Sequence, residues 1–294
     1  MLSLLKSDLY RGGHLRGNVA WYMIILFIFI FCNVGFAAAF GQIFNDAWAQ
    51  AAAESGQTEI TLDMFANFST PTNFLGHCLM GFGLLPILVC FSATNFCWTE
   101  MKDGFIKNSI TGVGKKQYFL AKLLFALVLS ALFCVVGVLI ALAMVAVSGI
   151  QFLAAESVGQ IIVWTLLAIL ICWACACICL TVLWIGKNQV IVYLLAFLLA
   201  TGMLSQIIAV AISFIPNAQW IYDIYAAIYD WLPRGAVALM NTPQIGAAEI
   251  LGSPSIVNAI SLGGEEILHI AVTSIVMIVA AYAVNMVFVR KRDF

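Results

Sequence analysis

Long apolar stretches alternate with shorter polar ones along most of this chain. A helix that crosses a membrane needs about 20 mostly apolar residues, and six runs reach that length. They cover residues 19–40, 74–98, 118–148, 159–185, 189–215 and 267–289. This pattern predicts an all-α integral membrane protein with six transmembrane helices. The third run is long enough to tilt in the bilayer or to project beyond it.

The composition agrees with the pattern. Of the 294 residues, 64% are hydrophobic and 9% are charged, and the mean hydropathy is +1.05. These values exclude a soluble domain. The net charge of -1 provides no basic field for nucleic acid. The nine cysteines fall almost entirely in the apolar runs, where they behave as small apolar side chains and indicate no compartment.

The positive charges predict the orientation. With six crossings, twelve of the thirteen Lys and Arg fall on one side, and only Arg234 falls on the other. Cytoplasmic loops carry the excess of Lys and Arg, so both termini are expected in the cytoplasm. The acids show the opposite bias. Those on the outer side are Asp46, Glu54, Glu59, Asp63, Glu156, Asp223, Asp230, Glu249, Glu265 and Glu266.

We divide the chain into a head, residues 1–17, and a single six-helix domain, residues 18–294. The head combines spaced leucines with Lys6, Arg11 and Arg16, and it is expected to lie as an amphipathic helix on the inner membrane surface. The outer segment 216–266 is rich in aromatic residues and prolines. It fits either a re-entrant hairpin before the last span or an outer loop with a surface-lying helix.

The cytoplasmic loop 99–117 is the most informative polar interval. An amphipathic segment fits residues 100–110, because its apolar and its charged side chains separate to two sides. Met101, Phe105 and Ile106 lie on the apolar side, and Glu100, Asp103 and Lys107 on the charged side. A segment of this kind, held between two membrane helices, is suited to contact a cytoplasmic partner.

Two motifs resemble chemical sites without meeting their requirements. The stretch Gly112-Val-Gly-Lys-Lys116 departs from the phosphate-binding loop, because Ser109 stands at the first glycine and Lys116 at the hydroxyl position. Any ATP must therefore be handled by another subunit. Cys172, Cys175, Cys177 and Cys179 lie on one predicted helix rather than in two separated pairs, so we interpret them as small packing residues and not as zinc ligands.

The spans carry a few neutral polar residues and no charged residue near a midplane. These polar side chains either line a substrate path or bond helices to one another. The candidates for a path are Asn33, Asn95, Thr201, Ser205 and Gln206. A small-ion pore or an ion-coupled carrier would need charged or more numerous polar groups. The sequence offers no credible Ser/His/Asp or Cys/His catalytic set, which disfavours a membrane enzyme.

The pattern Glu100-x-x-x-Gly104-x-x-Lys107-Asn108, followed by Tyr118-x-x-x-Lys122, resembles the membrane subunits of ABC-type-2 exporters. Two positions depart from the family pattern, since Phe105 replaces a usual Thr, and Lys115 and Lys116 stand where Arg is common. The likeness in layout covers the whole chain. In its length and its general sequence character, the chain is similar to permeases for antimicrobial peptides such as lantibiotics and bacitracin.

The resemblance implies a permease of the bacterial plasma membrane. The segment Glu100, Met101, Asp103, Gly104, Phe105, Ile106 and Lys107 would be the coupling helix that docks in a groove of a separate ATPase. Two ATPase subunits and a second permease chain, identical or homologous, would complete the working unit. ATP and Mg²⁺ would bind to the partner, with no cofactor in this chain. The alternatives are an ATP-independent secondary carrier and a non-transporting membrane enzyme or scaffold.

Overall fold

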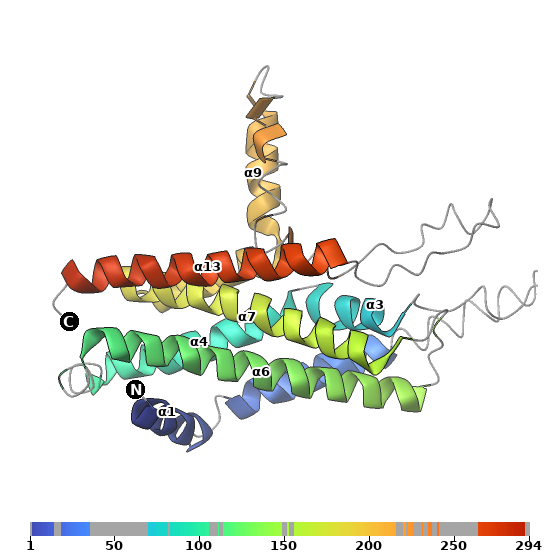
Figure 1. The fold of residues 1–294 in the computed structure, drawn as a ribbon, viewed down its shortest axis with the longest axis horizontal. Coiled ribbons are helices and arrows are strands. Elements are labelled where there is room, and N and C mark those ends of the chain that lie inside the picture. The colour runs from blue at the N-terminus through green and yellow to red at the C-terminus, as the bar shows by residue number, and fades with distance from the viewer. Residues whose placement is uncertain are drawn as a thin grey trace, which may run out of the picture.

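The structure is a computed structural model that describes residues 2–14, 19–35, 70–81, 83–105, 114–148, 156–215 and 264–291, with a few isolated positions between them. Its elements are all helices. Most of them run along one common direction and form an elongated bundle, and one helix stands out from it (Figure 1). The predicted all-α class is therefore confirmed.

Four helices are long and apolar enough to cross a membrane. They are α4 (Leu84–Lys102), α6 (Lys115–Ser148), α7 (Val158–Gly186) and α13 (Gly264–Lys291). These helices fall on the second, third, fourth and sixth apolar runs. A shorter apolar helix, Val19–Gly35, falls on the first run. The count of six spans remains a prediction.

Helix α7 lies at the centre of the bundle, where it contacts α4, α6, α8 and α13. Its first turn is held by a capping box, in which the Ser157 side chain accepts from the Gln160 backbone N–H and the Gln160 side chain bonds back to the Ser157 N–H. At its other end, Lys187 adopts a left-handed conformation with a φ of 49°. This closes the last turn and leads the chain directly into α8 (Gln189–Thr201).

The second apolar run is not one continuous helix. It consists of α3 (Pro71–Leu75), the π-helix η2 (Gly76–Gly81) and α4. Gly83 separates η2 from α4 with a φ of 69°. A Cβ at this position would stand 2.4 Å from the backbone oxygen of Ala200, so only glycine permits this approach of α4 and α8. Hydropathy alone does not report such an interruption.

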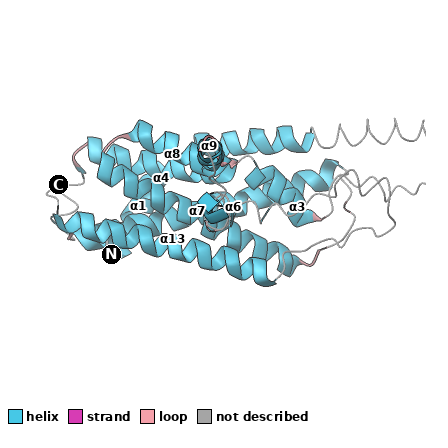
Figure 2. Ribbon diagram, turned by 90° about the horizontal axis from the view of Figure 1, so that it is seen from above, coloured by secondary structure: helices cyan, strands magenta, loops and turns pink. Residues whose placement is uncertain are grey.

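The fifth apolar run is also interrupted, so residues 189–215 do not form one continuous helix. Helix α8 ends at Thr201, and α9 (Met203–Ser213) begins after Gly202, whose φ is 76°. Helix α9 turns away from the bundle (Figure 1), and Figure 2 shows it end on above the other helices. The left-handed glycine makes this change of direction possible.

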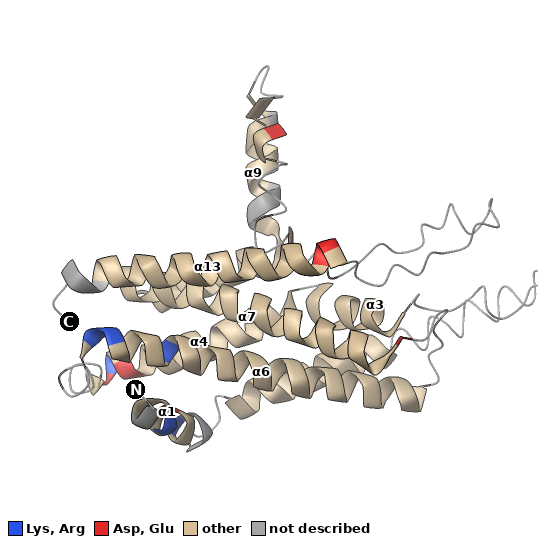
Figure 3. Ribbon diagram, viewed as in Figure 1, with Lys and Arg blue, Asp and Glu red and all other residues tan. Residues whose placement is uncertain are grey.

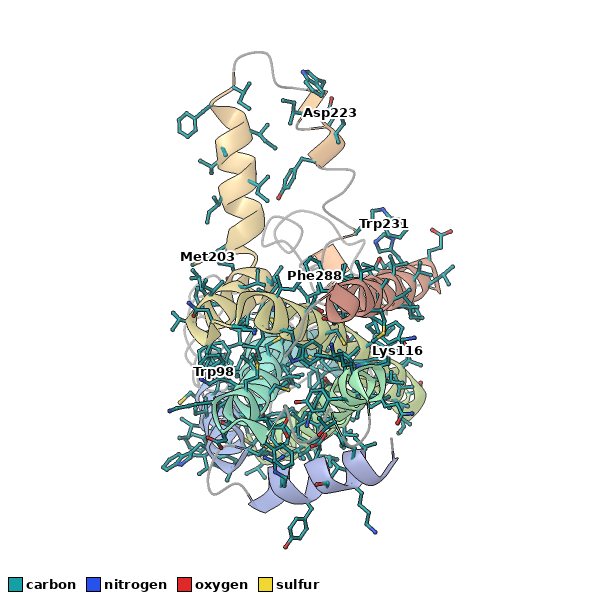
Figure 4. All side chains as sticks on the ribbon, turned by 90° about the vertical axis from the view of Figure 1, so that its left-hand side faces the viewer. Trp98, Lys116, Met203, Asp223, Trp231 and Phe288 are labelled. Atoms are coloured by element: carbon teal, nitrogen blue, oxygen red, sulfur yellow. The ribbon has the colours of Figure 1, made fainter. Side chains whose placement is uncertain are left out.

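Helix α1 (Leu2–His14) packs against α6 at one end of the bundle. When the bundle is seen along its length, α1 crosses it on one side (Figure 4). Leu4, Leu5 and Asp8 face inward, whereas Lys6 and Tyr10 are exposed. Most of the outer segment 216–266 lies outside the described residues, and so does the choice between a re-entrant hairpin and a surface-lying helix.

Candidate functional site

Charged side chains gather at the end of the bundle where α4 stops and α6 begins. Figure 3 shows the described Lys and Arg residues at this end, while the acidic first turn of α13 lies at the opposite end. The basic end is the one that the charge pattern assigns to the cytoplasm. Within it, Asp8, Arg11, Glu100 and Lys122 form a connected group, which we call the ion cluster.

Lys122 is the centre of the ion cluster. Its Nζ lies 2.6 Å from Oδ1 of Asp8 and 2.8 Å from the carboxylate of Glu100. Asp8 belongs to α1, Glu100 to the last turn of α4, and Lys122 to the second turn of α6. One ammonium group therefore joins three helices, and one of its partners, Asp8, is 114 positions away along the chain.

Arg11 and Tyr118 complete the bonding of Glu100. The Arg11 guanidinium lies 2.6 Å from Oε1 of Glu100, and the Tyr118 hydroxyl donates to Oε2 at 2.7 Å. The rings of Phe96 and Tyr118 lie 4.9 and 5.0 Å from Lys122 Nζ, within the range of a cation–π interaction. Glu100 thus accepts from three donors on two other helices, which fixes the orientation of its carboxylate.

Three of the four members of the ion cluster are withdrawn from solvent, whereas the Arg11 side chain is 26% exposed. The exposed fractions of Glu100 and Lys122 are 0%, and that of Asp8 is 1%. Its two acids and two bases balance, which is the condition for tolerating buried charge. Burial raises the pKa of Asp8, against the opposing effect of Lys122, and the Glu100 carboxylate raises it further. Among the described residues, Oδ2 of Asp8 has no hydrogen-bond partner.

The predicted coupling segment begins directly at this cluster. Helix α4 continues to Lys102, and the chain then turns at Asp103 and at Gly104, whose φ is 70°. After the turn, Phe105 is 38% exposed, and its ring centroid lies 4.0 Å from the Arg11 guanidinium carbon. Met101 is half-buried, and Lys102 and Asp103 are exposed. Ile106 and Lys107 lie outside the described residues.

The placement of Glu100 corrects one expectation. The amphipathic pattern puts Glu100 with Asp103 and Lys107 on the charged side, which is expected at the rim of the interface, but the structure buries it completely in the ion cluster. The reason is electrostatic. Lys122, Arg11 and Tyr118 supply the donors that a carboxylate loses when it leaves water. Glu100 therefore holds the start of the segment against the bundle and does not lie at the rim of the expected interface.

The candidate substrate-path residues are not brought together. Asn95 accepts from Gln189 Nε2 at 3.3 Å, which joins α4 to the start of α8. Asn33 and Thr201 instead donate to the backbone oxygens of Phe29 and Phe197 in their own helices. Ser205 and Gln206 belong to α9, but their side chains lie outside those that the structure describes. A substrate path through these residues stays a prediction.

The cysteines of α7 are all buried, as are their neighbours on other helices. Cys172 Sγ lies 3.9 Å from Cys134 Sγ of α6, and Cys90 of α4 is buried as well. Within the described ranges, no three His, Cys, Asp or Glu side chains form a group that could hold a metal ion. The thiols occupy the places where α4, α6 and α7 approach one another.

The sequence does not assign three members of this site to it, namely Asp8, Arg11 and Lys122. Two signals for them were nevertheless present. Asp8 is the only acid in an otherwise basic head, and Lys122 lies inside an apolar run rather than before it. A charged residue within a membrane span requires a partner. The sequence does not indicate which acid supplies it, because Asp8 is 114 positions away along the chain.

The apolar helices and the polarised charges define a multi-pass membrane protein. A family model described as ABC-2 family transporter protein matches residues 16–203, and the chain belongs to this family. It is therefore a permease component of an ABC transporter, a class that generally works with an ATPase subunit in a membrane. Comparison with curated proteins and with solved structures found no match. Glu100 and Lys122 lie inside the matched residues, whereas Asp8 and Arg11 precede them.

Proposed function

We propose that this chain is the transmembrane subunit of an ATP-driven exporter, and that the segment around Phe105 couples it to a separate ATPase. The observation that carries the proposal is the exposed Phe105 ring on a fixed turn at the basic end of the bundle. An aromatic side chain that is held in place and partly exposed is suited to anchor an interface. Buried Glu100 keeps the preceding turn in position.

The proposed assembly contains two ATPase subunits, which bind ATP and Mg²⁺, and a second permease chain, identical or homologous. Both termini of this chain lie in the cytoplasm of a bacterial cell. The twelve-to-one division of Lys and Arg supports this orientation. Single cysteines introduced into a cysteine-free variant test it. An impermeant reagent added to intact cells should label position 63 and not position 115, and the reverse pattern would refute the orientation.

The coupling role predicts a clear order of mutational effects. Phe105→Ala should lower the affinity for the ATPase about tenfold and should uncouple transport from ATP hydrolysis, because buried aromatic anchors dominate interfaces of this kind. Lys102→Ala is the matched control on the same turn. It should have little effect, since exposed charges at a rim contribute about 0–1 kcal/mol. Both variants are compared for membrane insertion, ATPase affinity and transport. Normal ATP-dependent transport after Gly/Ser replacement of residues 100–110 would refute the proposal.

We propose a lipophilic or amphipathic substrate, with a cationic antimicrobial peptide as the preferred candidate. The charge-poor spans favour a molecule that keeps its apolar part in the bilayer. The ten acids on the outer side attract a cationic molecule, an effect that weakens with salt. Expression with the ATPase in a sensitive host should raise survival against cationic peptides. Unchanged survival across a broad panel, together with ATP-driven movement of a small hydrophilic solute, would exclude this substrate class.

A further inference from the structure

Helix α1 contributes a side chain directly to the proposed coupling segment. Arg11 points toward the end of α4, where its guanidinium carbon lies 4.0 Å from the centroid of the Phe105 ring and 5.7 Å from that of Phe96. A guanidinium group at this distance from an aromatic ring attracts it through the ring quadrupole. Phe105 is therefore held by a residue 94 positions earlier in the chain.

Arg11 is itself fixed on its other side. Its guanidinium donates to Oε1 of Glu100 at 2.6 Å. Glu100 is in turn held by Tyr118 and Lys122, and Lys122 bonds Asp8, one turn before Arg11 on the same helix. The contacts form a closed circuit through α1, α4 and α6. Arg11 cannot leave Phe105 without breaking a charge-assisted hydrogen bond to a buried carboxylate.

We propose that Arg11 is a positioning residue for energy coupling, which holds the Phe105 ring in the orientation that docks with the ATPase. This inference rests on the proposed coupling function, and it goes beyond that function by assigning a role to α1. The family match begins at residue 16 and so does not include α1. The ion cluster makes α1 part of the coupling site, and Lys122 sets its place against the bundle.

A double-mutant cycle tests whether Arg11 acts through Phe105. The affinity of the permease in lipid nanodiscs for its purified ATPase subunit is measured for Arg11→Ala, Phe105→Ala and the double variant. We expect losses of about fivefold and tenfold for the single variants, and about tenfold for the double, because the ring that Arg11 holds is already absent. Independent contributions would instead multiply to about fiftyfold, and this result would overturn the proposal.

The matched control is Lys6→Ala, which removes an exposed cation from the outward side of the same helix. It should leave the affinity unchanged and should combine with Phe105→Ala without coupling. Arg11→Lys keeps the charge but loses the planar group that stacks on the ring. It should therefore give an intermediate affinity. An Arg11→Lys variant as weak as Arg11→Ala would still agree with stacking, whereas full activity of both Arg11 variants would refute the proposal.

A second measurement needs no ATPase. With 4-fluorophenylalanine at position 105 of the full permease, the ¹⁹F resonance should move and sharpen in Arg11→Ala, because the ring loses its cation and gains freedom. Lys6→Ala should leave the resonance unchanged. An unaltered resonance in Arg11→Ala would refute the positioning role even if Phe105 proves essential. Conversely, a shifted resonance with no effect of Phe105→Ala on ATPase affinity would refute the proposed coupling function and, with it, this role of Arg11.

Discussion

The basic end of the bundle and its centre around α7 are both closely packed, but by different interactions. At the end, one ammonium group joins two carboxylates from separate helices. At the centre, thiols and other small side chains fill the contacts, and the Asn285 amide donates to Thr181 Oγ1 at 2.7 Å between α13 and α7. The first arrangement depends on charge balance, and the second depends on close packing of neutral groups.

This difference indicates where the molecule can tolerate change. Small neutral residues stabilise membrane helices through many weak contacts, each of which is replaceable by another small residue. A buried ion pair depends on both partners, since the loss of one leaves the other charged and without compensation. The ion cluster also defines a single position for α1, because only one placement brings Asp8 and Arg11 to their partners.

The largest predicted effect is therefore that of Lys122→Met. This variant keeps the volume of the side chain but leaves Asp8 and Glu100 buried together with Arg11 as their only cation. We expect a loss of about 3–5 kcal/mol in the free energy of unfolding. Unfolding is followed with denaturant in detergent micelles, with Lys116→Met as the control, because Lys116 is an exposed cation of the same helix. The control should change stability by about 0.5 kcal/mol or less.

A neutral version of the cluster sharpens this test. Lys122→Met combined with Asp8→Asn and Glu100→Gln removes both buried negative charges, and it should recover much of the lost stability. Wild-type stability of Lys122→Met alone would show that the charges do not interact as the structure indicates. Failure of the triple variant to recover any stability would show that shape, rather than charge, decides the packing here.

The same contrast explains which parts of the fold the sequence predicts. Hydropathy places the third, fourth and sixth runs within a few residues of α6, α7 and α13, because a long buried or lipid-facing helix needs a continuous apolar stretch. It does not report the breaks at Gly83 and Gly202, since an apolar run remains apolar across a left-handed glycine. The glycines themselves were the only local signal.

The site is less predictable than the fold. The sequence directs attention to the stretch that contains Phe105, because a charged amphipathic segment between two spans is unusual. It gives the wrong exposure for Glu100, since periodicity assigns charged residues to the solvent side unless a partner is known. The partners of Glu100 come from distant segments, namely Arg11 and Lys122. Only the folded arrangement brings these groups together.

A smaller effect is predicted for Asp8→Asn, and its sign depends on pH. Burial raises the pKa of Asp8 above its ordinary value of 3.8, so the folded chain holds this proton more tightly than the unfolded chain. The contribution of Asp8 to stability is therefore fully present below pH 3.8 and decreases as the pH rises through the folded pKa. Asn cannot titrate and lacks this dependence, but it keeps an oxygen for Lys122.

Unfolding of the wild type and Asp8→Asn is therefore compared from about pH 4 to pH 7. We expect the wild type to lose stability relative to the variant as the pH rises through the folded pKa of Asp8. At neutral pH the variant should therefore be the more stable of the two. The ionisable groups that surround Asp8 are common to both proteins, namely Arg11, Cys97, Glu100, Tyr118 and Lys122. A pH profile that is the same in both would show that Asp8 does not titrate differently on folding.

The smallest effect on transport is expected at the centre of the bundle. Replacing Cys172, Cys175, Cys177 and Cys179 together by Ala should leave ATP-dependent transport largely intact, because Ala also permits close approach of the helices. The exposed fractions of these four side chains are at most 2%, so each replacement leaves a small cavity. The expected loss of stability is about 1 kcal/mol or less per site.

Transport and metal content of the purified protein are measured in parallel for this variant and the wild type. Cys32→Ala is the matched control, since Cys32 is an exposed thiol on helix Val19–Gly35. Equal transport in all three proteins is the expected result, because the thiols at the centre act through size and not through charge or coordination. Stoichiometric metal in the wild type, lost together with transport in the quadruple variant, would contradict this. It would also remove the contrast between the two regions, since both would then depend on charged or coordinating groups.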